Sequence, residues 1–290
     1  MSELFKWLSK TEGRRGESAS APALKMDVRD DIVYDPIVPV EPPPAKPTIF
    51  SHAEYDFRLA DPKITAILDA GTIPGEQFRF LRARLSLLQR QQGFKKLLIT
   101  SSIPEEGKTF VACCLAGILA QEPDKRILLI DADLRLPGTP KALGLENEGD
   151  LVGLAQILQR THTFKECLIK LSGMELFYLP PGEIPQNPSE LLASDCLEEL
   201  IRETTPMFDW IIVDAPPVLN VADPAHLAPL CDAVLLVVRA EKTPAKLVKK
   251  AIEMIGKNRI CGILMNRTHL RRDSRYYYKY YHSKTRSGLK

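Results

Sequence analysis

Lysine, threonine and aspartate residues stand at the ends of short apolar runs in this chain, in an arrangement that suits phosphate chemistry. The apolar run 97–100 leads into a loop that ends Gly107-Lys108-Thr109, and a stretch rich in alanine and leucine follows. A strand, a loop and a helix in this order allow backbone N–H groups to surround a phosphate, and the helix N-terminus adds positive potential. Lys108 would then reach the β- and γ-phosphates of a nucleotide, and the Thr109 hydroxyl would ligate Mg²⁺.

The loop follows the phosphate-loop (P-loop) pattern G-x-x-x-x-G-K-[ST] except at its first position, where Ser102 replaces glycine. Because GKT triplets also occur by chance, the strand before the loop and the helix after it carry most of the prediction. We therefore expect ATP to bind here. The residues predicted to contact it are Glu105, Glu106, Gly107, Lys108, Thr109, Phe110 and, after a later apolar run, Asn266.

Carboxylates follow two further apolar runs. Asp131 and Asp133 come after the run 127–130, and Asp214 comes after the run 210–213. Taken alone, such acids could simply be solvated residues at strand ends. Beside a phosphate-binding loop they have a more specific interpretation, because neighbouring acids that stay ionised need a cation, and Mg²⁺ supplies one.

These residues define a predicted catalytic set. We expect Thr109, Asp131 and Asp214 to hold Mg²⁺, directly or through water. The residues predicted to take part in catalysis are Lys108, Asp131, Asp133 and Asp214. Either Asp131 or Asp133 could orient or deprotonate an incoming hydroxyl group, and the sequence does not distinguish between them.

The elements that must position these residues follow from the hydrophobic pattern. Five apolar runs are continuous rather than alternating, which is typical of strands buried on both faces of a parallel sheet. Helical stretches separate them, so we predict an α/β fold with a doubly wound, mostly parallel sheet. In such sheets ligands bind beyond the carboxyl ends of the strands. The runs are 97–100, 127–130, 210–213, 233–238 and 260–264, and the helices include 75–90, 108–121 and 243–256.

The predicted helix 75–90 is amphipathic. Its apolar stripe consists of Phe78, Leu81, Leu85 and Leu88. Three charged residues, Glu76, Arg79 and Arg82, cluster nearly opposite that stripe. Spacing alone favours a solvated face for these three side chains.

The composition divides the chain into three regions. Residues 1–60 are predicted to be a disordered arm, because six prolines in the segment DPIVPVEPPPAKP favour extended chain. Residues 61–266 would form the nucleotide-binding domain. Residues 267–290 hold eight Lys or Arg against one acid, a charge of +7 in a chain of net charge +2, and are predicted to be a flexible basic tail. The low net charge does not indicate a nucleic-acid-binding protein.

The tail contains five of the eight tyrosines of the chain within six residues. Basic aromatic segments can stack on nucleic acid or serve as phosphoacceptors, and each phosphate would add about 1.5–2 negative charges. The six cysteines form no C-x-x-C pair, so we expect reduced thiols in a cytoplasmic protein. No apolar run approaches the ~20 residues of a membrane-spanning helix, and the start of the chain lacks a signal peptide.

The order of these motifs resembles the bacterial tyrosine kinases that control the chain length of exopolysaccharides and capsules. The resemblance covers about residues 75–281 and rests on TSSIPEEGKT, IDADLRLP, PPGEIPQNPSELL, IIVDAPP and the tyrosine cluster. It implies a protein-tyrosine autokinase that uses ATP and Mg²⁺ and regulates exopolysaccharide polymerisation and export. The phosphoacceptors it implies are Tyr276, Tyr277, Tyr278, Tyr280 and Tyr281.

The resemblance also implies partners. The family has an oligomerising E-x-x-R-x-x-R helix, matched here by Glu76, Arg79 and Arg82, which changes the interpretation of that charged face. Subunits would form a homo-oligomeric ring in which one tail enters the neighbouring active site. A membrane chain-length-determinant protein of the Wzz type would recruit this cytoplasmic chain to the inner face of the cell membrane and activate it, and a tyrosine phosphatase would act on the tail.

Two alternatives remain. One is a switch ATPase of the MinD/ParA type, which shares the P-loop fold but carries an extra lysine early in the loop, where this chain has Ile103. The other is a scaffold that only binds nucleotide within the export machine. One residue departs from the family pattern: Glu105 stands where relatives commonly have glycine, which eases close approach of the backbone to phosphate.

Overall fold

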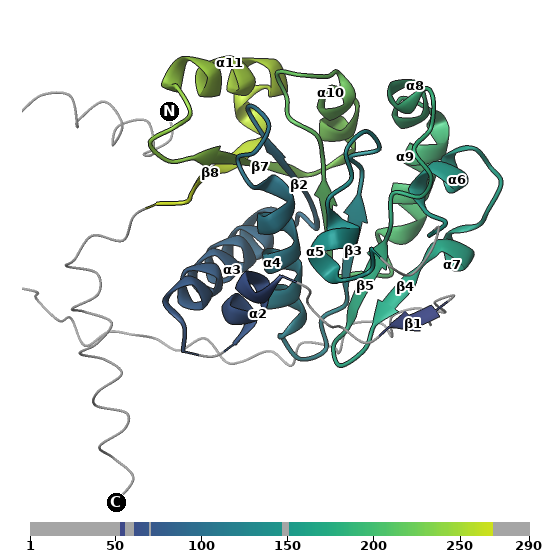
Figure 1. Cartoon of the computed structure of the whole chain (residues 1–290), viewed down its shortest axis with the longest axis horizontal. Helices are drawn as coiled ribbons and strands as arrows, with labels where there is room; N and C mark the ends of the chain where they lie inside the picture. Colours follow the sequence, from purple (N-terminus) through teal and green to yellow (C-terminus); the bar gives the residue numbers. More distant parts are fainter. Residues whose placement is uncertain (1–52, 56–60, 70, 147–150, 269–290) are drawn as a thin grey trace, which may run out of the picture. The chain divides into compact units, whose positions relative to one another are not determined.

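The computed structural model describes residues 53–55, 61–69, 71–146 and 151–268, and these residues build a sheet covered by helices (Figure 1). Eight strands lie in the order β1-β4-β5-β3-β6-β2-β7-β8, and every neighbouring pair is parallel except β4 and β5. Their bounds are β1 Ala53–Tyr55, β2 Lys96–Ser101, β3 Ile127–Asp131, β4 Ile169–Leu171, β5 Leu176–Leu179, β6 Trp210–Asp214, β7 Ala233–Arg239 and β8 Ile260–Asn266. The predicted doubly wound, mostly parallel sheet is confirmed.

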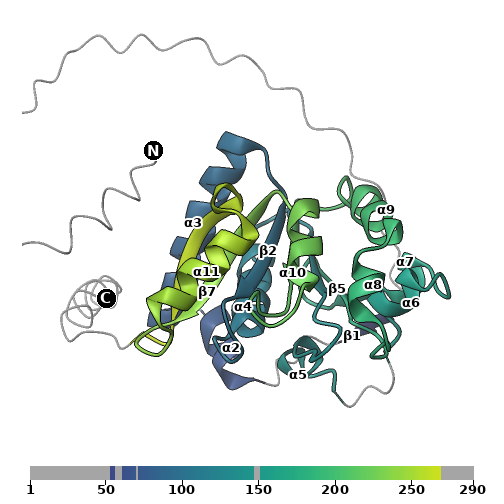
Figure 2. The ribbon, with the colours of Figure 1, turned by 90° about the horizontal axis from the view of Figure 1, so that it is seen from above.

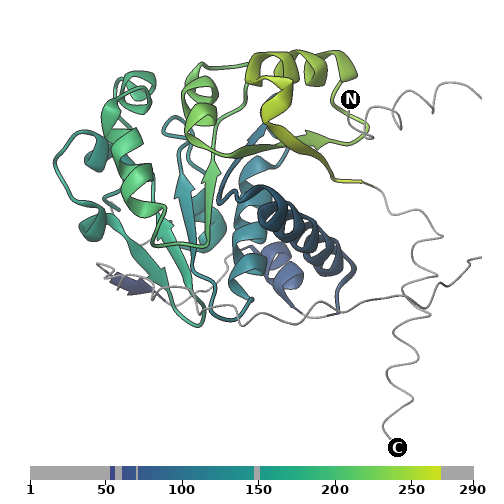
Figure 3. The same cartoon turned by 180° about the vertical axis from the view of Figure 1, so that it is seen from behind.

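The sheet is buried on both faces because successive strand residues belong to two different cores. In β2, Leu97 and Ile99 join the core on one face, whereas Leu98 joins the core on the other. Helices cover both faces, as the views in Figures 2 and 3 show. The first core includes residues of α2 Pro62–Leu68, α3 Ile73–Gln92, α4 Lys108–Ala120 and α5 Thr139–Leu143. The second includes residues of α6 Leu154–Leu158, α7 Phe164–Cys167, α8 Pro188–Leu192, α9 Asp195–Thr204, α10 Asp223–Leu227 and α11 Ala245–Ile255.

The helix that follows the P-loop, α4, lies deepest in the molecule. Ten of its thirteen residues are buried, so it is apolar on nearly every side. A Cβ added at Gly117 would lie 2.8 Å from the side chain of Leu68, because α2 packs closely against α4 at this glycine. The helix that carries the P-loop lysine at its first position is therefore fixed by packing on several sides.

The predicted amphipathic helix 75–90 is observed as α3, which begins two residues earlier and ends two residues later. Thr72 caps its start by accepting a hydrogen bond from the Gly75 amide at 3.1 Å, and Gly93 ends it in the left-handed conformation at φ 72°. Leu85 is buried, and the other three residues of the predicted stripe pack against the first core.

All five predicted strands are present, but three strands were missed. β1, β4 and β5 have only three or four residues each, too short to give a distinct apolar pattern. β1 lies inside the predicted arm 1–60, so that part of the arm prediction is wrong for residues 53–55, which pair with β4 at the sheet edge. The tyrosine cluster, the rest of the predicted arm and almost all of the tail lie outside the described residues. Within the described part of the chain, no helix combines the length and apolarity needed to cross a membrane.

Candidate active site

The order of the strands brings the predicted site residues together at the carboxyl ends of three central strands, β3, β6 and β2. We call this end of the sheet the P-loop edge. Strand β6 lies between β3 and β2, so the acid that ends β6 stands between the acid that ends β3 and the P-loop that follows β2. Asp131 and Asp214 are direct register partners across β3 and β6. Both carboxylates are fully buried. The predicted convergence at the carboxyl ends of the strands is therefore observed.

Lys108 reaches across this edge to the acids. Its Nζ lies 2.7 Å from Oδ2 of Asp133 and 3.9 Å from Oδ1 of Asp214, and it donates to the Thr109 hydroxyl at 3.3 Å. Burial by itself would lower the pKa of Lys108, but the charges of Asp214, Asp133 and Asp131 outweigh it and raise that pKa. Lys108 is therefore a stable cation that faces three carboxylates.

The two register partners differ in their hydrogen bonds. Oδ1 of Asp131 accepts from the Asp133 amide at 3.0 Å, and Oδ2 accepts from both the amide and the hydroxyl of Thr139. The two oxygens of Asp214 are buried and have no hydrogen-bond partner of normal geometry in the described structure. Burial raises the pKa of both carboxyls, and for Asp214 the Lys108 cation opposes that rise. Asp131 is held in place by three hydrogen bonds, whereas Asp214 has the Thr109 hydroxyl and the Lys108 ammonium group as its polar neighbours.

These groups fit a magnesium ion. Three carboxylates face one ammonium group, and Asp214 offers two buried oxygens without a hydrogen-bond donor of normal geometry. Hard oxygen ligands of this kind, together with the Thr109 hydroxyl, suit Mg²⁺. No group of three or more His, Cys, Asp or Glu side chains within the described ranges is arranged to hold a metal alone. Phosphate oxygens and water would therefore complete the coordination, as is usual for Mg²⁺ at nucleotide sites.

Two residues behind Asp131 were missed by the sequence analysis. The Thr139 hydroxyl, which bonds Asp131, also lies 2.7 Å from the hydroxyl of Tyr178. Tyr178 is fully buried in β5, and burial raises the pKa of its phenol well above the ordinary value. The sequence signal that could have indicated them is a single tyrosine inside the apolar run LFYL, because a buried hydroxyl needs a hydrogen-bond partner. These residues fix the orientation of Asp131 from inside the protein.

The P-loop itself contains one strained residue. Glu105 has φ 63°, in the left-handed region that favours glycine, and its side chain is exposed. The departure from the family pattern noted above therefore falls on a position whose backbone conformation suits glycine. Gly107 has φ 92°, in the left-handed region that favours glycine, and a Cβ there would lie 2.2 Å from Nδ2 of Asn266, so a side chain at this position would displace the Asn266 amide.

Glu106 braces the P-loop from behind. Its carboxylate is almost completely buried and accepts hydrogen bonds from the amides of Ile103 and Arg239 at 2.9 and 3.1 Å and from the Thr243 hydroxyl. Asn266 adds a second brace by donating to the Glu106 carbonyl at 2.8 Å. The side chains of Glu106 and Asn266 are thus both engaged in hydrogen bonds within the protein. For Glu106, the group that remains available to contact a nucleotide is its backbone amide.

The prediction for Phe110 is likewise limited to its backbone. Its side chain packs against the first core, so its backbone amide, at the start of α4, is the group available to a phosphate.

A hollow of about 280 Å³ lies beside the P-loop and is lined in part by Ile103, Glu105, Arg239 and Lys242. It adjoins the P-loop and belongs to the same site.

The charged residues of α3 bind their own chain. Arg79 forms an ion pair with Glu76 at 3.1 Å and donates to the carbonyls of Leu68 and Asp69, where α2 ends, at 3.3 and 3.2 Å. An arginine at the C-terminus of a helix stabilises the unpaired carbonyls there.

Arg82 makes the equivalent contacts to α4. It donates to the Ile118 carbonyl at 2.9 Å and lies 3.3 Å from Glu122. The side chains of Arg79 and Arg82 are only 21% and 24% exposed, so the interpretation of a solvated face is wrong for them. Their predicted role in a subunit interface stays a prediction.

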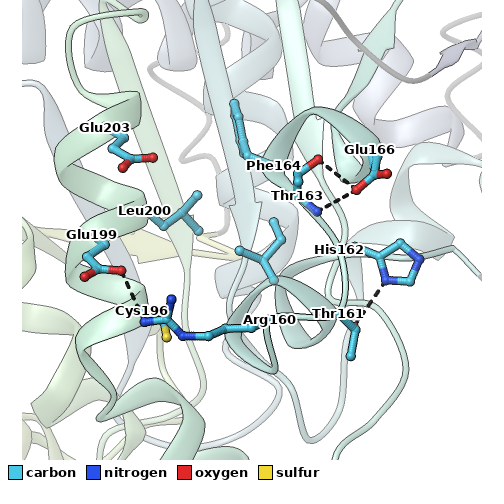
Figure 4. A pocket seen from close by; sticks show the side chains of 11 residues that line it. Arg160, Thr161, His162, Thr163, Phe164, Glu166, Cys196, Glu199, Leu200 and Glu203 are labelled. Atoms are coloured by element: carbon cyan, nitrogen blue, oxygen red, sulfur yellow. Dashed lines mark hydrogen bonds and ion pairs between the residues drawn. The ribbon is translucent and has the colours of Figure 1, made fainter.

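Another hollow, with a volume of about 370 Å³, lies elsewhere, between α6, α7 and α9 (Figure 4). Two of its three acids are already paired: Glu166 accepts from the amide and hydroxyl of Thr163, and Glu199 pairs with Arg160 at 3.5 Å, while the third, Glu203, is exposed. None of the predicted site residues lines it. We therefore locate the chemistry at the P-loop edge.

A parallel sheet with a P-loop after one strand and aspartates after its neighbours defines a nucleotide-binding P-loop protein. In agreement, a family described as AAA domain matches residues 105–260. Tyrosine-protein kinase YwqD of Bacillus subtilis is 35% identical over 217 residues, which cover 74% of this chain and 90% of YwqD. The chain therefore belongs to the family of bacterial tyrosine-protein kinases, as its motifs predicted.

Two further relatives agree. Tyrosine-protein kinase wzc of Salmonella typhimurium is 30% identical over 80% of this chain, although the match spans only 32% of that longer protein. The kinase domain of Escherichia coli tyrosine kinase ETK has a similar structure, with a TM-score of 0.65, 26% identity and coverage of 77% of this chain and 93% of that domain. The switch-ATPase alternative is therefore not favoured.

Proposed function

We propose that this chain is an ATP-dependent tyrosine kinase that transfers the γ-phosphoryl group to tyrosines of its own C-terminal cluster. The observation that carries the proposal is the position of Lys108, whose ammonium group lies at 2.7 Å from Asp133 and 3.9 Å from Asp214 at the end of the P-loop. A cation and acids at one buried edge are what phosphoryl transfer requires, because its catalysis consists mostly of positioning and charge stabilisation.

Each side chain has a distinct part in this reaction. Amides of the P-loop and of the start of α4 would hold the phosphates, and Lys108 would neutralise charge on the β- and γ-phosphates. Thr109 and Asp214 would bind Mg²⁺ directly, and Asp131 would bind it through water, because hydrogen bonds already fix both of its oxygens. When bound, Mg²⁺ would neutralise charge on the bridging and terminal phosphate oxygens.

The transfer step places a tyrosine oxygen in line with the γ-phosphorus. A bond forms between these two atoms, the bond from the γ-phosphorus to the β–γ bridging oxygen breaks, and ADP leaves. The phenolic proton passes to the acid pair Asp131–Asp133. A free tyrosine has a pKa near ~10, so a carboxylate close to the hydroxyl is needed at neutral pH.

The biological setting follows from the family. We propose that Tyr276, Tyr277, Tyr278, Tyr280 and Tyr281 are the acceptors, that subunits form a ring through Glu76, Arg79 and Arg82, and that a tyrosine phosphatase reverses the modification. A Wzz-type membrane protein would recruit the chain to the inner face of the cell membrane and activate it, and the kinase would regulate exopolysaccharide polymerisation and export.

The test uses the full chain with MgATP, alone and together with the cytoplasmic segment of a chain-length-determinant protein. We expect phosphotyrosine on the tail, detected by phosphopeptide mapping, and no signal from Lys108→Met or from a chain lacking residues 276–281. ATP binding or hydrolysis without phosphotyrosine in either condition would reject the kinase proposal. Loss of hydrolysis on deleting the tail would argue against a switch ATPase.

A further inference from the structure

Arg135 lies two residues after Asp133, on the loop that leaves β3. We propose that Arg135 is a positioning residue that, together with Asp223 and Ser189, holds the loop carrying Asp131 and Asp133 against the P-loop. We call Arg135, Asp223 and Ser189 the clasp. The inference deepens the proposed kinase function and rests on it for its catalytic readout.

The clasp joins three segments that are distant in sequence. Nε of Arg135 donates to Oδ2 of Asp223 at 2.8 Å, and Nη2 donates to Oδ1 at 3.4 Å and to the Ser189 hydroxyl at 2.8 Å. The Ser189 hydroxyl in turn donates to Oδ1 of Asp223. Both oxygens of Asp223 are therefore engaged, and the planar guanidinium group suits this two-point contact.

Burial shows that the clasp is built into the protein. Asp223 is 0% exposed, whereas the side chain of Arg135 is 38% exposed. A fully buried carboxylate is costly unless it is paired, so Arg135 supplies the charge that Asp223 needs. Asp223 at the start of α10 and Ser189 on α8 thereby hold Arg135, and with it the loop that follows β3, against the helices that cover the second face of the sheet.

The other side of the same loop faces the P-loop. Oδ1 of Asp133 accepts from the Leu136 amide at 3.1 Å, which ties the acid to the residue next to Arg135. A Cβ added at Gly138 would lie 3.2 Å from the Thr109 side chain, so the loop approaches the start of α4 closely. The clasp therefore sets how far Asp133 stands from Lys108 and Thr109.

Without the clasp, the hydrogen bonds of Asp131 to Thr139 and to the Asp133 amide would alone have to hold this loop against repulsion between the acids. Asp131, Asp133 and Asp214 lie at the same end of the sheet, and the ion pair with Lys108 draws Asp133 towards the P-loop. Phosphoryl transfer is sensitive to such displacements, since a misplacement of ~1 Å can cost about 100-fold in rate. Supporting partners outside the ligand shell of a metal commonly change affinity or activity by ~10–100-fold.

The test compares four full-length variants. Arg135→Lys keeps the positive charge but loses the planar guanidinium group that contacts Asp223 at two points. Ser189→Ala removes one hydroxyl, and Asp223→Asn removes the buried charge. The fourth variant combines Arg135→Lys with Asp223→Asn. The control is Arg160→Lys, which alters an exposed arginine paired with Glu199 far from the P-loop edge. The readouts are kcat and KM for tail phosphorylation, ADP affinity in EDTA, ADP affinity in Mg²⁺, and Tm.

A positioning role predicts a specific combination of results. We expect kcat to fall by about 10–100-fold in Arg135→Lys and by less in Ser189→Ala, with KM for ATP nearly unchanged. ADP affinity in EDTA should stay within about threefold of the wild type, because Lys108 and the loop amides are intact, while the gain in affinity from Mg²⁺ should shrink by about tenfold. The double variant should be no worse than its more impaired single variant, because both changes break one contact.

Other outcomes overturn the inference. If Arg135→Lys loses activity while Ser189→Ala and Asp223→Asn retain it, Arg135 contacts the substrate itself. If all variants lose ADP binding in EDTA together with a fall in Tm, the clasp serves only general stability. If the wild type makes no phosphotyrosine, the kinase proposal fails, and the Mg²⁺-dependent gain in ADP affinity still decides whether the clasp positions the acids.

Discussion

Asp131 and Asp214 lie directly opposite each other at the ends of the neighbouring strands β3 and β6. Their environments nevertheless differ, because Asp131 accepts three hydrogen bonds through its two oxygens, whereas the oxygens of Asp214 accept none of normal geometry. Two buried carboxylates of like charge raise the free energy of the ligand-free protein. That cost is relieved when a divalent cation binds, so affinity for metal and instability of the empty site have the same origin.

Asp214→Asn should stabilise the metal-free protein at alkaline pH. Burial raises the pKa of Asp214 in the folded state, so the folded protein binds this proton more tightly than the unfolded chain does. The resulting stabilisation is present below the ordinary carboxyl pKa of about 4 and is lost as the pH rises through the higher folded-state value. Thermal melts in EDTA at pH 8 should show the variant higher by roughly 1 kcal/mol, or about 2–4 °C.

Two comparisons make that prediction decisive. At pH 5 the advantage of Asp214→Asn should shrink, because the wild-type carboxyl is then largely protonated in the folded state. Addition of MgADP at pH 8 should raise the Tm of the wild type more than that of the variant. A variant that is less stable than the wild type at pH 8 in EDTA would contradict the proposed electrostatic cost.

Asp133 and Asp131 should differ in their effects on transfer. Asp131 is fixed by Thr139 and by the Asp133 amide, whereas Oδ2 of Asp133 contacts the ammonium group of Lys108. A phosphate that attracts Lys108 would free Asp133 to accept the phenolic proton. We therefore expect Asp133→Asn to lower kcat by about 10²–10⁴-fold with little change in the Mg²⁺ dependence of ADP binding.

Asp131→Asn is the matched comparison for that experiment. It should reduce the gain in ADP affinity that Mg²⁺ provides, measured by calorimetry with and without EDTA, as well as kcat. If Asp131→Asn abolishes transfer with its Mg²⁺ response intact, while Asp133→Asn remains active, the two roles are reversed.

Glu105→Gly should tighten nucleotide binding. Glu105 adopts φ 63°, which costs a residue with a side chain about 1–2 kcal/mol, and it brings a negative charge close to the phosphate-binding loop. Replacing it by glycine removes both effects. Relief of the backbone strain stabilises the folded loop, and loss of the negative charge favours phosphate binding, so we expect the Kd for ATP to fall by roughly 2–10-fold. Glu105→Gln separates the two causes, because it removes the charge but keeps the strained backbone. Weaker binding by the glycine variant than by both the wild type and the glutamine variant would refute the prediction.

Glu106→Gln should weaken the same loop. The buried carboxylate accepts from Ile103, Arg239 and Thr243, and an amide group in its place would turn an NH₂ towards one of these donors. A buried group left without its partner costs about 1–3 kcal/mol, so both the free energy of unfolding and ATP affinity should fall. Glu105→Gln, an exposed change at the adjacent position, should leave the free energy of unfolding unchanged, as denaturant titration would report.

The sequence by itself determined the central strands of the sheet and which acids stand at their carboxyl ends. Strands 96–101, 127–131 and 210–214 are continuous apolar runs that only a doubly covered sheet can bury, and the P-loop lysine and the three aspartates follow those runs directly. Since neighbouring parallel strands end at one edge, their order in the sequence was enough to predict that these four side chains would converge.

Tertiary structure decided how each side chain is used. Whether Glu106 and Asn266 meet a nucleotide or brace the loop depends on residues 133 to 160 positions away, which no local pattern reveals. The clasp likewise joins Arg135 to partners 54 and 88 positions distant. Hydrogen bonds and buried charges depend on distances in space, whereas hydrophobic periodicity is local. The sequence therefore predicted which residues lie at the edge, and the folded chain determined which of them remain free to act.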